Sequence, residues 1–214
     1  MPRTRVTRLR EYQVCDRSAL DALLDETRVG HIGFTADEDP DGYPVVIPTA
    51  IARDADVILV HGSTGSRWMR TVAKGAPACL AVTALDGVMV ARSAFESSFH
   101  YRSAVIFGSF ERLEGDAKAR ALDVLTDKLI PGRRDEIRPP SKKELSKTMV
   151  LALQIEKWSL KISDGWPSDG ADDLAGSAWA GVVPLVERAG VPIAAPDLRS
   201  DIPVPQSVSA LALR

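Results

Sequence analysis

Residues 57–67 are Val57-Ile58-Leu59-Val60-His61-Gly62-Ser63-Thr64-Gly65-Ser66-Arg67. The four apolar residues predict a buried strand, which breaks into a Gly/Ser/Thr loop and is followed by a helix headed by Arg67. Such a junction gathers free backbone N–H groups, hydroxyl donors and the positive end of a helix dipole, and the guanidinium adds a bidentate donor. The segment therefore predicts a phosphate-binding loop. Ordinary helix capping by Ser and Gly is the alternative interpretation.

Two well-known nucleotide motifs do not fit this loop. No Gly-Lys-Ser/Thr follows it, as a Walker loop would require, and it lacks the GxGxxG of a dinucleotide fold. The anion it is expected to bind therefore belongs to another class of ligand.

Short strands are expected on both sides of the loop. Apolar runs and period-two patterns predict them over residues 29–35, 43–52, 57–61, 78–84, 87–92, 103–113 and 149–155, the last being the final core strand. Turn residues predict hairpin loops over 37–42 and 53–56 and a turn at Asp86-Gly87. Since Pro44 and Pro48 cannot donate to a ladder, their strand is expected at a sheet edge or with a bulge, which leaves amides free for a ligand.

Helices are expected to be few. Helical spacing predicts them over residues 16–26, with Asp16 as N-cap, over 63–74 and over 116–129. Six or seven strands with only brief helices favour a barrel or sandwich over a parallel βαβ fold.

Composition is that of an ordinary globular protein. Of the 214 residues, 45% are hydrophobic and 26% charged, and the formal net charge of −2 gives no field that would attract nucleic acid or an anionic membrane. Cys15 and Cys79 have no CxxC spacing, and no stretch has the length of a membrane span or a leader. A reduced, cytoplasmic setting is expected. A DNA-associated module that uses the basic N-terminus remains an alternative.

The domain boundaries follow the composition. Residues 1–165 are expected to form one domain, with 1–10 as a basic flexible arm. Residues 166–214 are rich in Gly, Ala, Pro, Ser and Asp, so we expect a loosely ordered extension that packs on a partner subunit.

Several spaced motifs resemble one family. Segments 28–34, 44–49, 59–67, 91–95, 101–108, 131–133 and 138–145 are similar to those of the pyridoxamine 5′-phosphate oxidase-like flavoproteins, most closely the branch with the nitroimidazole-resistance reductases. The resemblance covers roughly residues 16–165. It implies a mainly β fold with short α-helices, a six-stranded antiparallel split β-barrel that forms a homodimer with FMN in the clefts between subunits.

The same resemblance implies the site residues. The strand residues Val46, Ile47, Pro48 and Thr49 would lie along the isoalloxazine ring. The ring and the ribityl chain would be near His61, Gly62 and Ser63, and the phosphate would be bound by Ser66 and Arg67. The second subunit would contribute Tyr101, Arg102, Ser103, Trp158 and Lys161.

The chain also departs from the oxidases of that family. A basic residue follows the phosphate-binding arginine in those enzymes, whereas here Trp68 does, and their Arg-rich C-terminal motif has no counterpart in residues 164–214. The resemblance therefore predicts an FMN-dependent oxidoreductase that is not a pyridoxamine 5′-phosphate oxidase. It would take electrons from a nicotinamide donor and reduce a small organic acceptor, with His61 as the catalytic candidate.

Other functions stay open at this point. A non-catalytic flavin carrier or sensor is one alternative, and the same fold with F420 or haem as the ligand is another. A metal site is not expected, because His31 and His100 have no partners at metal-ligand spacing.

Overall fold

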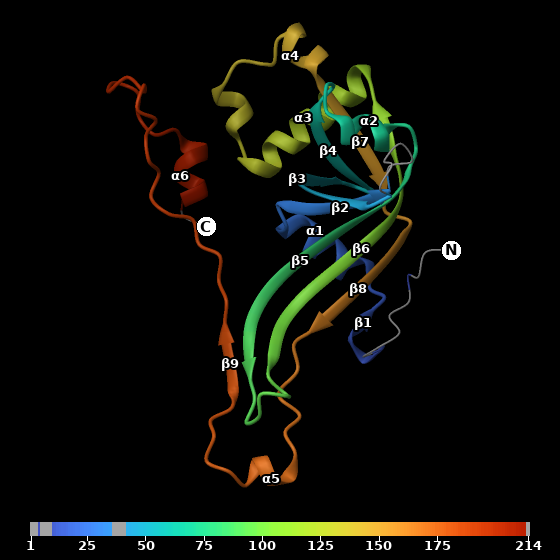
Figure 1. Cartoon of the computed structure of the whole chain (residues 1–214). Coiled ribbons are helices and arrows are strands. Elements are labelled where there is room, and N and C mark those ends of the chain that lie inside the picture. Colours follow the sequence, from blue (N-terminus) through green and yellow to red (C-terminus); the bar gives the residue numbers. More distant parts are fainter. Residues whose placement is uncertain (1–3, 5–9, 36–41, 213–214) are drawn as a thin grey trace.

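The computed structural model describes residues 4, 10–35 and 42–212 (Figure 1). These residues form one mainly antiparallel sheet whose strands are β1 (Gln13–Val14), β2 (Val29–Thr35), β3 (Pro44–Asp54), β4 (Val57–Ser63), β5 (Pro77–Val90), β6 (Ser98–Leu113), β7 (Thr148–Gln154), β8 (Lys157–Ser163) and β9 (Gly181–Pro184). The α-helices are α1 (Arg17–Glu26), α2 (Arg67–Ala73), α3 (Gly115–Leu129), α4 (Lys142–Lys147), α5 (Ala171–Leu174) and α6 (Gln206–Ala212). Two short 3-10 helices are η1 (Arg10–Tyr12) and η2 (Arg133–Glu136).

Six strands close into a ring. The order β6-β7-β4-β3-β2-β5 is completed by pairing of β5 with β6, and every pairing is antiparallel. Strands β8 and β1 extend the sheet from β6, and β9 extends it from β5. The expected six-stranded antiparallel split barrel is therefore confirmed.

Two apolar clusters hold the barrel together. Helix α1, whose N-cap Asp16 accepts a hydrogen bond from the Ser18 amide, buries Leu20, Leu23 and Leu24 completely against the barrel interior. Each such leucine stabilises the fold by about 1.5–3 kcal/mol. On the outside, α3 packs Ala121 and Leu125 against β3, β4 and β7. The helices thus cover the barrel at two places and leave the edges of β3 and β4 open.

Strands β5 and β6 continue far beyond the barrel. They span 14 and 16 residues and form a long curved hairpin below it in Figure 1, with β9 alongside β5 and α5 near the tip. At the tip, the Asp169 carboxylate binds the Arg92 amide at 2.8 Å and its guanidinium at 2.9 Å. We call residues 83–103 of this hairpin, together with β9, the arm.

The predicted turn at Asp86-Gly87 is wrong. Strand β5 runs through it, and only the register with β6 shifts, between Leu85 and Gly87. A Cβ at Gly87 would lie 3.0 Å from Cγ1 of Val182, so this glycine allows β9 to approach closely. A bulge and a turn require the same residue types, which is why the sequence suggested a turn.

Two further boundaries differ from expectation. The strand expected over 149–155 is not the last one of the core, because β8 follows it. The residues of β8 alternate between polar and apolar, as in Lys157-Trp158-Ser159-Leu160, which is the pattern of a partly exposed strand. Helix α2 begins at Arg67 and not at residue 63, since Ser63 still pairs with Thr148 of β7. Strand β6 also starts earlier than expected, at Ser98.

Some expectations fall on residues that are not described. The hairpin loop predicted over 37–42 lies outside the described residues except for Gly42. Most of the basic N-terminal segment 1–10 lies outside them as well. No helix in the part that is described has the length and apolar character needed to cross a membrane.

Candidate functional site

The barrel is split between β3 and β4. Pairing of these strands ends at Ile51 opposite Val60. Beyond that point, within the described residues, the Pro44–Ala50 half of β3 pairs with β2 alone, and His61–Ser63 pair with β7 alone. Both strands therefore present one unpaired edge to the same opening, as the prolines of β3 led us to expect.

Backbone hydrogen bonds show which groups of β3 face the opening. The Ile51 amide donates to the Arg28 carbonyl at 3.1 Å, so the odd-numbered residues of β3 point their N–H and C=O groups at β2. Since these groups alternate along a strand, Val46 and Pro48 point theirs at the opening. Proline has no N–H, which leaves Val46 as the donor between Pro44 and Pro48.

A second hydrogen bond shows which backbone groups of β4 face the opening. The Thr64 amide donates to the Lys147 carbonyl at 2.9 Å, so even-numbered residues of β4 face β7. The backbone groups of His61 and Ser63 consequently face the opening. Gly62 has another role, because a Cβ there would lie 3.1 Å from Cγ of Met69, and the glycine thus lets α2 pack closely on β4.

The loop after β4 is held by its own hydrogen bonds. The Ser63 hydroxyl accepts from the Gly65 amide at 3.1 Å, the Ser66 amide donates to the Ser63 carbonyl at 2.9 Å, and Arg70 donates to the Gly65 carbonyl at 3.0 Å. Ser66 is the N-cap of α2, yet its hydroxyl makes no capping bond. Within the described residues, these bonds leave the Ser66 hydroxyl without a partner.

Arg67 is the group best placed to bind an anion. It is the first residue of α2, its side chain is exposed, and the described residues give its guanidinium no hydrogen bond or ion pair. An unpaired guanidinium beside a free serine hydroxyl suits a phosphate, which accepts several charge-assisted hydrogen bonds. Trp68, by contrast, packs against the core.

His61 borders a cavity of about 500 Å³. The cavity lies between β4, α3 and α4, and its other lining residues are Leu122, Thr126, Ile137, Arg138, Pro140, Glu144, Leu145 and Thr148. The imidazole keeps an exposed edge, but burial of the rest disfavours its charged form and lowers the pKa of His61 below the ordinary 6.5. A neutral imidazole therefore faces the cavity at neutral pH.

An ion pair forms the rim of this cavity. Arg138 donates to the Glu144 carboxylate at 2.9 and 2.7 Å, and Glu144 also accepts from the Ser141 amide in a capping box at the start of α4. The Arg138 guanidinium, then the Ser141 hydrogen bonds, hold the pKa of Glu144 well below its usual range. The rim thus carries a fixed pair of opposite charges.

The second predicted group lies elsewhere in the fold. Tyr101, Arg102 and Ser103 are on the arm part of β6, and Trp158 and Lys161 are on neighbouring β8. Pairing of β6 with β7 begins only at Phe110, seven residues or about 23 Å along the strand from Ser103. The structure therefore does not bring Tyr101, Arg102 and Ser103 to the β3–β4 opening of their own chain. Trp158 and Lys161 are separated from β4 by the strands β6 and β7.

Contacts within the chain already occupy parts of this group. Arg102 donates to both carboxylate oxygens of Asp86, at 2.9 and 2.7 Å, and to both of Glu26, at 2.6 and 3.0 Å. The Asp86 hydrogen bonds, then those of Glu26, raise the pKa of Arg102 further. The Lys161 ammonium lies 5.8 Å from the ring centres of both Tyr12 and Tyr101.

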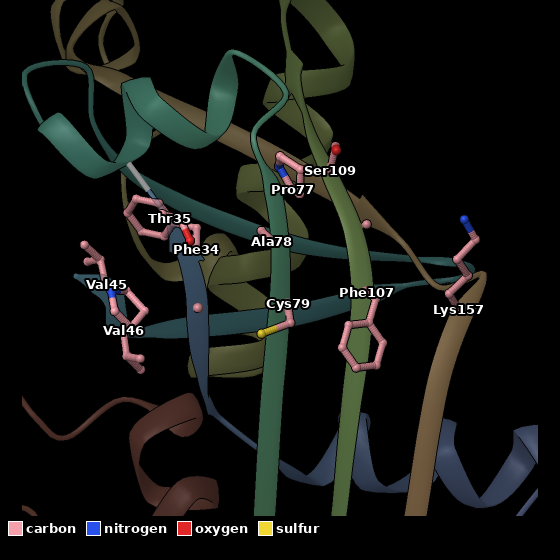
Figure 2. A pocket seen from close by; sticks show the side chains of 13 residues that line it. Phe34, Thr35, Val45, Val46, Pro77, Ala78, Cys79, Phe107, Ser109 and Lys157 are labelled. Atoms are coloured by element: carbon pink, nitrogen blue, oxygen red, sulfur yellow. The ribbon is translucent and has the colours of Figure 1, made fainter. Parts of the chain in front are cut away.

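A second pocket, of about 610 Å³, lies on the outer face of the sheet. In Figure 2, Thr35, Val45 and Val46 lie on one side of it and Lys157 on the other, with Cys79 and Phe107 between them. Sequence reasoning missed this pocket, because its walls come from five strands. Within the described residues, no three His, Cys, Asp or Glu side chains are grouped as a metal site.

The sequence matches the family model described as pyridoxamine 5′-phosphate oxidase over residues 16–162. No significant relative is found among the curated proteins.

Solved structures give clear relatives. The FAD and haem binding protein from Mycobacterium smegmatis is 50% identical, covers 94% of this chain and 97% of its own, and has a TM-score of 0.88. The flavocytochrome Anf3 from Azotobacter vinelandii is 33% identical, covers 99% and 97%, and has a TM-score of 0.90. A proposed 5-nitroimidazole antibiotic resistance protein from Bacteroides thetaiotaomicron, at 18% identity, 70% and 86% coverage and a TM-score of 0.58, shares the fold.

Proposed function

The chain belongs to the pyridoxamine 5′-phosphate oxidase family, and within it we propose that the protein is a flavin-dependent oxidoreductase whose cofactor binds at the β3–β4 opening. One observation carries the proposal. The unpaired edges of β3 and β4 converge on a loop where the Ser66 hydroxyl and the Arg67 guanidinium have no partner in the described residues.

The residues present fit a flavin. A flat heteroaromatic ring with alternating donors and acceptors matches an open strand edge, which here offers the Val46 amide and the carbonyls of Val46 and Pro48. The phosphate matches Ser66 and Arg67, and Gly62 and Ser63 lie between these two ends. When bound, the flavin supplies hydride and electron transfer.

The protein's own part is binding and proton control. Val46 to Thr49 would orient the ring, and His61 would present a neutral imidazole beside it, able to accept a proton or to donate one from the ring nitrogen. A nicotinamide donor and a small organic acceptor are the partners that we assign to this chemistry. A carrier or sensor without turnover would use the same residues.

We further propose that a second copy completes the site. Tyr101 and Ser103 lie too far along the arm to reach the opening of their own chain, and Trp158 and Lys161 lie on the neighbouring strand β8. The same part of a partner subunit would bring these residues there. The guanidinium of Arg102 donates to Asp86 and Glu26 of its own chain, so we assign it a structural role in fixing the arm.

The comparisons widen the choice of flavin from FMN to FAD. The 50% identical relative is described as binding FAD and haem, and the 33% identical one as a flavocytochrome. An adenosine half would extend from the phosphate site at Ser66 and Arg67.

Haem as an additional cofactor is favoured by the same two relatives. In the described residues, His31 and His61 have no hydrogen-bond partner, whereas Nε2 of His100 contacts the Gly165 carbonyl at 2.8 Å. A carbonyl contact at one ring nitrogen leaves the other free to bind iron, so all three histidines are ligand candidates. Loss of the Soret band in His31→Ala, His61→Ala or His100→Ala would identify the ligand.

The absorption spectrum of the purified protein tests the main proposal. Flavin bands and a Soret band report the two cofactors separately, and chromatography of the acid-released flavin separates FMN from FAD. Reduction by NADH or NADPH with a series of acceptors separates an enzyme from a carrier. A colourless protein that takes up neither FMN nor FAD would refute the assignment.

A further inference from the structure

The pocket on the outer face of the sheet, which we call the outer pocket, is built on one row of residues that crosses five strands. In strand order from β3 to β8, and each paired with the next, the row is Val46, Gly33, Cys79, Phe107 and Lys157. Residues paired across neighbouring strands point to the same face of a sheet. Ile32, Leu80 and Ile106, which alternate with members of the row, are completely buried in the barrel, so the row itself faces outward.

Small residues in the middle of the row leave the outer pocket open. A Cβ at Gly33 would lie 3.0 Å from Sγ of Cys79, so the thiol takes the space that a larger side chain would fill. Figure 2 shows Val46 at one end and Lys157 at the other. The row spans the spacing of five strands, about 19 Å along the sheet. With its volume of about 610 Å³, the outer pocket is large enough for a small-molecule ligand.

The outer pocket is apolar, with one cation at its end. Its apolar lining includes Pro44, Val45, Val46, Pro77, Ala78 and Phe107. Lys157 is the one charged residue of the lining, all of which the structure describes. Its side chain is exposed, and the described part of the chain gives its ammonium no hydrogen bond or ion pair. An apolar trough that ends at a free ammonium is complementary to an apolar molecule that ends in a carboxylate.

The charge pattern separates this ligand from other anions. A phosphate is commonly held by several donors at once, whereas the outer pocket offers a single ammonium. Nucleic acids and anionic membrane surfaces are attracted by clusters of basic side chains, and the lining contains no second basic residue. A small molecule with one carboxylate remains as the ligand that fits.

We propose that the outer pocket binds a small apolar carboxylate. The carboxylate lies at Lys157, and the apolar body of the ligand extends over Phe107 and Cys79 towards Val46. Of the residues assigned to the flavin, Val46 alone lines the outer pocket, and its part in the flavin site is played by the backbone. The proposal therefore does not rest on the flavin assignment.

The test titrates the full-length protein, as purified, with decanoate in a calorimeter. Decan-1-ol is the uncharged probe with the same chain length. Decanoate should bind to one site per chain with a dissociation constant below about 1 mM. Lys157→Ala should raise this constant about 5-fold or more and leave that of decan-1-ol unchanged, because only the carboxylate uses the ammonium. Lys142→Ala is the matched control, since Lys142 is an exposed lysine of α4 that does not line the outer pocket.

Cys79 reports where the probe lies. Alkylation by iodoacetamide, followed by mass spectrometry of the peptides, measures Cys79 and Cys15 in the same sample. Decanoate at ten times its dissociation constant should slow the alkylation of Cys79 roughly 10-fold and leave that of Cys15 unchanged. Protection of Cys15 instead would overturn the proposal, because Cys15 and Lys157 also line a neighbouring cavity.

Three other results would overturn it: no binding of decanoate to the wild type, an unchanged decanoate affinity in folded Lys157→Ala, or an equal loss of affinity in Lys142→Ala. Circular dichroism checks that each variant is folded. The absorption spectrum of the same samples records the flavin separately. Flavin bands in a protein that fails to bind decanoate would refute the outer pocket alone, whereas a colourless protein that takes up no flavin but binds decanoate at Lys157 would refute the flavin assignment alone.

Discussion

Replacing Arg67 with alanine should weaken flavin binding strongly and leave the fold intact. The guanidinium is exposed and has no partner in the described part of the chain, so its loss should change the free energy of unfolding by less than about 0.5 kcal/mol. Charge-assisted hydrogen bonds to a phosphate contribute about 1.5–3 kcal/mol, which corresponds to a ~10- to 150-fold rise in the dissociation constant. Arg67→Lys should lie in between, because it keeps the charge without the bidentate geometry.

The measurement is a fluorescence titration of apoprotein with FMN and, separately, with FAD. Arg120→Ala is the matched control, since Arg120 is also an exposed helical arginine without a partner among the described residues. Thermal unfolding of each apoprotein checks the fold. Equal affinities for wild type and Arg67→Ala, with both proteins folded, would place the phosphate site elsewhere and refute the reasoning.

Three further predictions address the surroundings of the site. Gly62→Ala should lower the free energy of unfolding by about 1–3 kcal/mol, because its Cβ would press on Met69, whereas Gly65→Ala, with only Ser63 Oγ at 3.5 Å, should change it little in urea unfolding. The pKa of His61 is lowered in the folded state, so the free energy of unfolding should begin to fall as the pH drops below about 6.5 and should level off below the folded-state pKa. Urea midpoints measured against pH should show this fall in the wild type, and His61→Gln should lack the contribution of His61. Arg102→Ala should lower the free energy of unfolding by about 1 kcal/mol, a value that allows for solvent screening of its ion pairs. If Arg102 only shapes the arm, the fluorescence titration should give an unchanged flavin affinity.

Much of the fold was predictable because the signal for most strands lies within the strand's own sequence. The strongly apolar runs in β4, β5, β6 and β7 and the N-cap Asp16 of α1 are local signals, and the structure confirms them. Strand β8 was missed although Trp158, Leu160 and Ile162 alternate with polar residues, which is a local strand signal, and β9 carries only four residues. The bulge at Leu85 was mistaken for a turn, because only the partner strand β6 distinguishes the two.

The site was predictable in part for the same reason. Ser66 and Arg67 stand next to each other in a local strand–loop–helix signal, so the sequence identifies them as a pair. The backbone direction of Val46 and His61 depends on pairing with Arg28 and Lys147, which are distant in the sequence. The outer pocket likewise depends on long-range packing, for which a single sequence carries no periodic signal.

The prolines of β3 explain why the barrel opens where the proposed cofactor binds. If the β3–β4 register continued past Ile51 and Val60, Pro48 would stand opposite Ser63, where the ladder requires an N–H that proline lacks. Pro48→Ala supplies that donor, so the ladder should extend and compete with the flavin for the same edge. We expect weaker flavin binding together with an apoprotein that is stabilised by about 0.5–1.5 kcal/mol, measured by fluorescence titration and urea unfolding. Unchanged affinity, with residue 48 shown by hydrogen exchange to be protected in the apoprotein, would mean that the flavin does not use this edge.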